Sequence, residues 1–126
     1  MQPKIKALIE QIESGQLKTN MSRIGHFIMT RGGSDIETMR SILNIKHQSL
    51  TGSMSIMEDN GLIFKSGTCK DGRFTQWMWE PSDMMRMMRM HDVKQRKFEM
   101  LCKRLYSDFS DMMSNTMIDE IDKILN

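Results

Sequence analysis

The chain has 126 residues, which suits one compact domain with appendages. Its composition, 39% apolar and 27% charged, is typical of a soluble globular protein and excludes a disordered chain. The net charge is only +2, so bulk charge alone does not mark a nucleic-acid binder. No run approaches the roughly 18 apolar residues of a membrane span, and the first residues lead into an amphipathic segment instead of a signal region. We therefore expect a cytoplasmic protein without a membrane partner.

Cysteine and histidine positions argue against metal binding and catalysis. Cys69 and Cys102 lie far apart, without a Cys-x-x-Cys pair or a histidine at zinc-ligand spacing. His26 and His91 lack a partner at catalytic spacing. There is no Ser-His-Asp order and no phosphate-binding glycine loop. We expect a protein that is not an enzyme, with reduced thiols, no metal site and no cofactor.

Two amphipathic helices are predicted at the start of the chain. The first occupies residues 3–14 of an N-terminal arm, residues 1–16, and ends near Ser14-Gly15. The second ends at Arg31-Gly32-Gly33, where glycine provides a C-terminal stop. The apolar residues at helical spacing are Ile5, Leu8, Ile9 and Ile12 in the first helix, and Leu17, Met21, Ile24, Phe27 and Ile28 in the second.

Residues 34–60 predict two more helices around a break at residues 44–46, the arrangement of a helix-turn-helix unit. We expect Ser34 to cap the first of them, with Glu37 completing a capping box. The second is expected from about 47 to 60, with Gly61 as its stop. Their apolar faces consist of Ile36, Met39, Ile42 and Leu43 in the first, and of Leu50, Met54 and Met57 in the second.

A β-hairpin is predicted next. Residues 62–65 and 74–79 are rich in strand-forming residues and flank a turn that contains Lys70-Asp71-Gly72-Arg73, in which Asp-Gly is a strong hairpin signal. Trp77 and Trp79 alternate onto one face of the second strand. Base stacking is one use for them, but packing onto the helices is the favoured one. The hairpin therefore has a basic tip and an apolar base.

The C-terminal part, residues 82–126, predicts two helices. Pro81 ends the second strand, and Ser82 is expected to cap a helix that continues to about residue 114, followed by a helix of about ten residues from Thr116. Residues 81–104 contain seven Lys or Arg against three acidic residues, whereas residues 105–126 contain one against five. The expected fold is mostly α with a small β-hairpin: a winged helix-turn-helix over residues 17–81 with helical extensions at both ends.

The run from Gln48 to Ile63 resembles the recognition helix and first wing strand of MarR-like regulators, and small phage-encoded winged-helix proteins look similar. Its most specific part is Gly61-Leu62-Ile63, followed by Lys65 and the Lys-Asp-Gly-Arg tip. The resemblance covers about half of the chain. It implies a transcriptional regulator that binds double-stranded DNA as a homodimer, in some members with a small ligand.

In a winged helix the second helix of the unit enters the major groove, while the wing, here residues 65–74, contacts the backbone or the minor groove. Gln48 can pair with adenine, the hydroxyls nearby can donate to bases or phosphates, and Gly52 allows close approach. The alternative is that these are solvated polar residues. The predicted DNA-binding residues are Lys46, His47, Gln48, Ser49, Thr51, Gly52, Ser55, Lys65, Lys70 and Arg73.

The predicted recognition helix contains no arginine, and Glu58 and Asp59 at its far end would repel phosphate. Affinity is therefore expected from the wing, from a second subunit or from a basic segment. For that segment a solvated helix face is the favoured alternative. It comprises Arg86, Arg89, Lys94, Arg96, Lys97, Lys103 and Arg104.

Methionine is unusually frequent, at 16 residues, and in the Met-rich stretch of residues 84–90 apolar residues occur all round the predicted helix. Compositional bias is one explanation, and a surface that requires burial is the other. A homodimer is the favoured occupant, since symmetric dimers are the commonest oligomers. The expected dimerisation residues are Met87, Met88, Phe98, Leu101, Leu105 and Phe109. The alternative function is a protein–protein interaction module, such as a phage factor that binds and inhibits a host protein.

Overall fold

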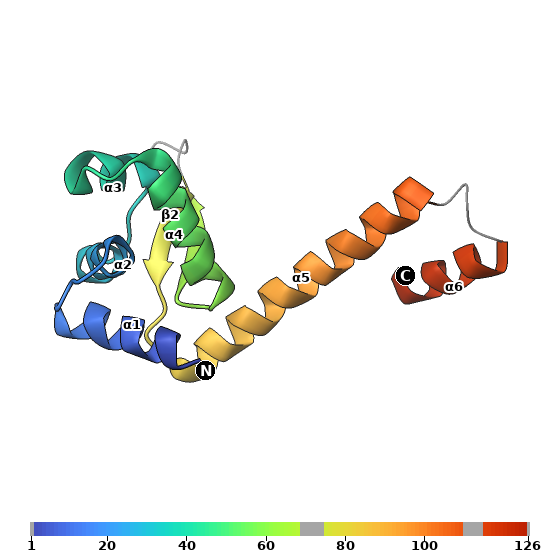
Figure 1. Cartoon of the computed structure of the whole chain (residues 1–126), viewed down its shortest axis with the longest axis horizontal. Coiled ribbons are helices and arrows are strands. Elements are labelled where there is room, and N and C mark those ends of the chain that lie inside the picture. Colours follow the sequence, from blue (N-terminus) through green and yellow to red (C-terminus); the bar gives the residue numbers. More distant parts are fainter. Residues whose placement is uncertain (1, 69–74, 110–114, 126) are drawn as a thin grey trace. The chain divides into compact units, whose positions relative to one another are not determined.

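The computed structural model of the chain describes residues 2–68, 75–109 and 115–125 (Figure 1). The chain divides into two compact units, Met1–Met90 and His91–Asn126. No helix within the described ranges is both long enough and apolar enough to cross a membrane.

The first unit is a winged helix-turn-helix. It comprises four helices and an antiparallel hairpin (Figure 1). In the hairpin, Ile63 pairs with Trp79 and Lys65 pairs with Trp77. The order helix, helix, turn, helix, hairpin is the predicted one, so the predicted fold class is confirmed. The elements are α1 (Pro3–Ser14), α2 (Asn20–Arg31), α3 (Ile36–Leu43), α4 (His47–Asp59), β1 (Ile63–Thr68), β2 (Thr75–Trp79) and the start of α5 (Asp83–Phe109).

The core of this unit lies between α1, α2, α4 and the hairpin. Leu50, Met54 and Met57 of α4 are buried, as the spacing predicts, and so are the apolar residues predicted for α1. Gly25 of α2 faces Ile12 of α1, and a Cβ at this position would overlap the Ile12 side chain. This close approach explains why α1 packs directly onto α2. The buried stripe of α4 faces this core, whereas Ile56 of the same helix is 48% exposed.

The predicted cap at Ser34 is wrong. Ser34 forms an isolated bridge with the wing: its N–H donates to the Trp77 carbonyl at 2.9 Å, and the Trp77 N–H donates to the Ser34 carbonyl at 2.7 Å. The N-cap is the next residue, Asp35, whose Oδ1 accepts from the Thr38 N–H at 2.8 Å. Glu37 pairs with Arg40 instead of completing a capping box. The extended backbone required by the bridge moves the helix start by one residue.

Two apolar residues predicted for helical stripes lie elsewhere. Helix α2 begins at Asn20, because Thr19 forms a capping box with Ser22, so Leu17 precedes the helix and is 37% exposed. Ile42 of α3 is 56% exposed, although Met39 on the same helix is fully buried. The apolar face of each helix therefore contains one residue fewer than predicted.

We expect Asp35→Ala to lower the free energy of unfolding by about 1 kcal/mol, the usual cost of losing an N-cap. Ser34→Ala, which keeps the backbone bridge to Trp77, is the matched control and should have a much smaller effect. Urea unfolding of both variants measures the difference. Equal losses would contradict the assignment of Asp35 as the cap.

The second unit contains the remainder of α5 and helix α6 (Asn115–Leu125). Helix α6 agrees with the predicted final helix to within one residue at its start. Large apolar side chains of this unit are exposed: Phe98 at 59%, Leu101 at 51%, Leu105 at 45% and Phe109 at 44%. This unit by itself leaves an apolar helix surface uncovered.

Candidate nucleic-acid interface

The predicted DNA-binding residues of α4 share its solvent side. We call them the recognition face: Lys46, His47, Gln48, Ser49, Thr51, Gly52 and Ser55. Thr51 is half-buried and the other six are exposed. They face solvent because the opposite side of α4 fills the core. The structure thus places all seven on one accessible surface.

The N-terminus of α4 lacks a side-chain cap. Its N-cap residue, Lys46, makes no side-chain cap hydrogen bond, whereas Thr19 and Asp35 cap the two preceding helices. The first amides of a helix point outward and carry partial positive charge, which suits an anion. The Thr51 hydroxyl donates to the His47 carbonyl at 3.0 Å, which leaves its oxygen as an acceptor. The first two turns therefore present amides and polar side chains to solvent.

Gly52 has no packing reason to be glycine. A Cβ at this position would have no heavy atom of the described residues within 4 Å. Glycine in the interior of a helix costs about 0.5–1 kcal/mol relative to alanine. The fold therefore gains nothing from Gly52, whereas a partner that approaches the helix backbone closely would.

The wing contributes one described residue to the predicted site. Lys65 of β1 is exposed, and its ammonium lies 5.3 Å from the centre of the Trp77 ring. Trp77 itself is only 7% exposed, so packing of this residue onto the helices, the favoured alternative, is confirmed. Lys70 and Arg73, predicted for the wing tip, lie outside the described residues.

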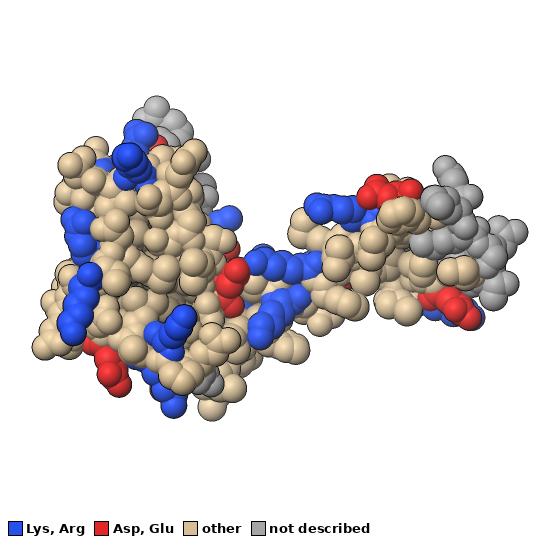
Figure 2. All heavy atoms as spheres, viewed as in Figure 1, with Lys and Arg blue, Asp and Glu red and all other residues tan. Residues whose placement is uncertain are grey.

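Charge is sparse on the recognition face. Between His47 and Met57, α4 carries no Lys, Arg, Asp or Glu, and in Figure 2 the surface over α4 is mainly uncharged. The Lys and Arg side chains visible on the first unit are dispersed over it (Figure 2). Glu58 and Asp59 stand at the far end of α4, half-buried. This surface is suited to hydrogen bonding more than to charge attraction.

Two residues of the predicted basic segment are not available to phosphate. Arg86 is 2% exposed, and Arg89 is 30% exposed and paired with Glu80 at 2.8 Å. They stack on Trp79 and Phe64, with ring-centre distances of 5.0 and 3.6 Å. Neither the phosphate-contact hypothesis nor the solvated-face alternative fits Arg86. Sequence reasoning missed this role, although its signal is present: two arginines three residues apart in a run otherwise made of methionine. The other five residues of the segment, Lys94, Arg96, Lys97, Lys103 and Arg104, are exposed.

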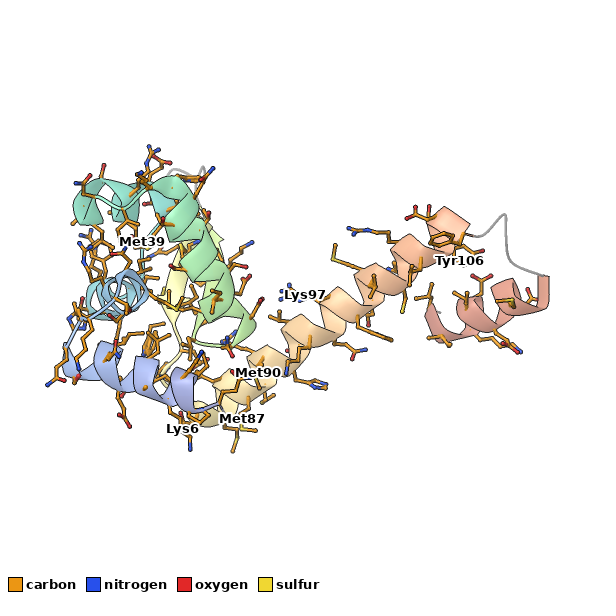
Figure 3. The ribbon with its side chains drawn as sticks, in the orientation of Figure 1. Lys6, Met39, Met87, Met90, Lys97 and Tyr106 are labelled. Carbon is orange, nitrogen blue, oxygen red and sulfur yellow. The ribbon has the colours of Figure 1, made fainter. Side chains whose placement is uncertain are left out.

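The predicted dimerisation residues are exposed in the single chain. Met87 is 57% exposed and Met88 is 54% exposed. Phe98, Leu101, Leu105 and Phe109 are between 44% and 59% exposed. Met87 lies beside Lys6 of α1, and the two help to line an open pocket of about 350 Å³ (Figure 3). These apolar side chains are accessible to a partner in the single chain.

Comparisons with known proteins find solved structures at low sequence identity and low TM-score. No family model matches the chain, and no curated protein matches it. Among solved structures, ZitR of Lactococcus lactis has 14% sequence identity and a TM-score of 0.43, over 97% of this chain and 87% of that chain. The adhesin competence repressor AdcR of Streptococcus pyogenes has 16% identity and a TM-score of 0.42, over 97% and 90%.

Proposed function

We propose that this protein is a transcriptional regulator of the MarR-like kind that binds double-stranded DNA. Helix α4 enters the major groove, and the wing, residues 65–74, contacts the backbone or the minor groove. The chain acts as a homodimer, so that two copies of α4 meet successive half-sites of a duplex.

The observation that carries this proposal is the recognition face. It combines hydrogen-bonding side chains, an uncapped helix N-terminus and a glycine without a packing role on one exposed surface. Gln48 can accept and donate at once, which matches the two groups that adenine presents in the major groove. A merely solvated helix surface does not require glycine at position 52.

Phosphate affinity in this proposal comes from outside α4. Lys65 supplies one contact from the wing, and Lys70 and Arg73 are expected to supply others. A second copy doubles these contacts and adds a second recognition face. This explains how a helix with so little charge of its own can serve a duplex-binding protein.

Selection from a random duplex library tests the binding mode. We expect the protein to enrich a site with two related half-sites. Gln48→Ala should relax the preference at one base position in each half-site, whereas Lys65→Gln should lower the salt slope by about one per copy for every sequence. Failure to enrich any sequence, with no change in either variant, would contradict the proposal.

The homodimer is expected to depend on the exposed apolar residues of α5. Leu105→Glu should convert a dimer into a monomer, because a charge in the contact must be desolvated without a partner. Leu105 is 45% exposed in the single chain, so its own unit should remain folded. Ser107→Glu, at an exposed position of the same helix, adds the same single negative charge and is the matched control. Light scattering gives the mass of each variant. An unchanged dimer in Leu105→Glu would exclude this surface as the contact.

A second candidate function is a protein–protein interaction module, such as a phage factor that inhibits a host protein. The exposed methionines at the start of α5 favour it: Met84 at 73%, Met87 at 57% and Met88 at 54%. Methionine adapts to irregular apolar partners. Substituting Met87 and Met88 with Gln should then release a captured protein while leaving the free energy of unfolding unchanged, since both side chains are exposed. Retention of every partner by this variant would count against the second candidate.

A further inference from the structure

Arg89 of α5 holds the base of the wing through two contacts. Its Nε–H donates to Glu80 Oε1 at 2.8 Å, and its guanidinium carbon lies 3.6 Å from the centre of the Phe64 ring. Phe64 belongs to β1 and directly precedes Lys65, the described wing residue proposed to contact phosphate. The contact between Arg89 and Phe64 is therefore one residue away from Lys65 along the strand.

Glu80 connects the wing to α5. It is only 7% exposed, and its N–H donates to the Leu62 carbonyl at 2.9 Å, which continues the hairpin beyond the two strands. One carboxylate oxygen accepts from Arg89, and the other accepts from the Ser82 N–H at 3.3 Å. A buried carboxylate that loses its cation is strongly unfavourable. The Glu80–Arg89 pair is therefore a strong constraint on the base of the hairpin.

Arg86 holds the second strand in the same way. Its Nε–H donates to the Glu80 carbonyl at 2.7 Å, and its guanidinium lies 5.0 Å from the centre of the Trp79 ring in β2. Each strand of the wing thus carries an aromatic residue beneath an arginine of α5. We call Glu80, Arg86 and Arg89 the α5 clamp.

We propose that Arg89, acting through Glu80 and Phe64, is a positioning residue that sets where the wing presents Lys65 to DNA. The inference rests on the proposed function and extends it by identifying what aims the wing. An isolated two-stranded hairpin is marginally stable, so its direction depends on what its base is packed against. The base of the wing packs into the core through Ile63 and Trp77, and it is further joined to its unit by the Ser34 bridge and by the α5 clamp.

The role requires arginine specifically. A planar guanidinium can stack on an aromatic ring and donate an in-plane N–H to a carboxylate at the same time. A lysine ammonium at position 89 keeps the charge but cannot make both contacts in this geometry. Arg89→Lys should therefore behave like Arg89→Gln.

A double-mutant cycle on the full chain tests the inference. Dissociation constants for a random duplex are measured at low salt for the wild type, Arg89→Gln, Lys65→Gln and the double variant. Lys65→Gln alone is expected to weaken binding about fivefold through the lost phosphate contact. In the Arg89→Gln background, Lys65→Gln should weaken binding less than about 1.5-fold. Without Arg89 the wing changes its orientation, so Lys65 no longer reaches the phosphate.

The control is Arg96→Gln, which removes the same charge from an exposed position of the same helix. Its effect should combine additively with that of Lys65→Gln. The inference would be overturned if the effects of Arg89→Gln and Lys65→Gln on the dissociation constant were also additive. It would likewise be overturned if Lys65→Gln weakened binding as much in the Arg89→Lys background as in the wild type. Loss of stability alone lowers the folded fraction without coupling the two sites, and urea unfolding corrects for it.

Measurements on the protein without DNA test the α5 clamp independently of the proposed function. The chain has two tryptophans, Trp77 and Trp79, and both lie in β2. Hydrogen exchange of the β2 amides and tryptophan emission should therefore both change in Arg89→Gln. Unchanged exchange and emission would overturn the clamp itself. If they change while the wild type binds no duplex at any salt concentration, the proposed function fails, and the positioning role fails with it.

Discussion

Gly61→Ala is expected to lower the free energy of unfolding by about 3 kcal/mol. Gly61 has a φ of +74°, and a Cβ on it would overlap the backbone carbonyl of Arg86. The left-handed conformation costs a residue with a side chain about 1–2 kcal/mol, and the overlap adds a cost of similar size. Backbone atoms cannot swing aside as the end of a side chain can. The turn between α4 and β1 must therefore move away from α5.

Gly15→Ala is the matched control for Gly61→Ala. Gly15 has a similar φ of +80°, but its Cβ would meet only His26 Cε1, at 3.7 Å, an ordinary contact. It should show the conformational cost alone, about 1–2 kcal/mol. Urea unfolding of the two variants isolates the cost of the overlap. Equal destabilisation would contradict the close packing of Gly61 against the start of α5.

Gly52→Glu is expected to weaken duplex binding about a hundredfold, or about 2.7 kcal/mol, because it places a carboxylate among phosphates. The same change should raise the stability of the protein by about 0.5 kcal/mol, since glutamate forms helices better than glycine. The position is open to solvent, so the fold does not oppose a longer side chain. A gain in protein stability together with a loss of duplex affinity would identify the surface around Gly52 as functional.

Gly52→Gln is the control, since it has the same shape without the charge. It should reduce binding through bulk alone, and by a smaller factor than Gly52→Glu. Fluorescence anisotropy gives the affinities, and thermal unfolding gives the stabilities. If Gly52→Glu binds duplex as the wild type does, α4 does not face DNA in the proposed manner.

The elements defined by local spacing were predictable from the sequence. The stripes of α1 and α4 repeat at helical intervals, and the glycines that follow these helices have positive φ. Leu50, Met54 and Met57 form the inward face of α4, so the polar residues on its other side must face solvent. For this reason the exposure of the recognition face was also predictable.

Features set by distant pairing were not predictable from local patterns. The cap moved from Ser34 to Asp35 because Ser34 pairs with Trp77, more than forty residues away. Arg86 is buried and Arg89 is partly buried because they stack on Trp79 and Phe64 of the wing. Spacing within one helix does not reveal which strand packs upon it. The base contacts, the wing tip and the dimer surface remain predictions.

Fluorescence anisotropy of the wild-type protein with random duplex DNA, across a salt series, tests duplex binding most directly. The mass in solution is determined on the same sample. We expect a dimer that binds at micromolar concentrations or below, with an affinity that falls steeply as salt rises, because several phosphates are contacted by each dimer. Absence of binding even at low salt would contradict the proposed function and direct the search toward a protein partner.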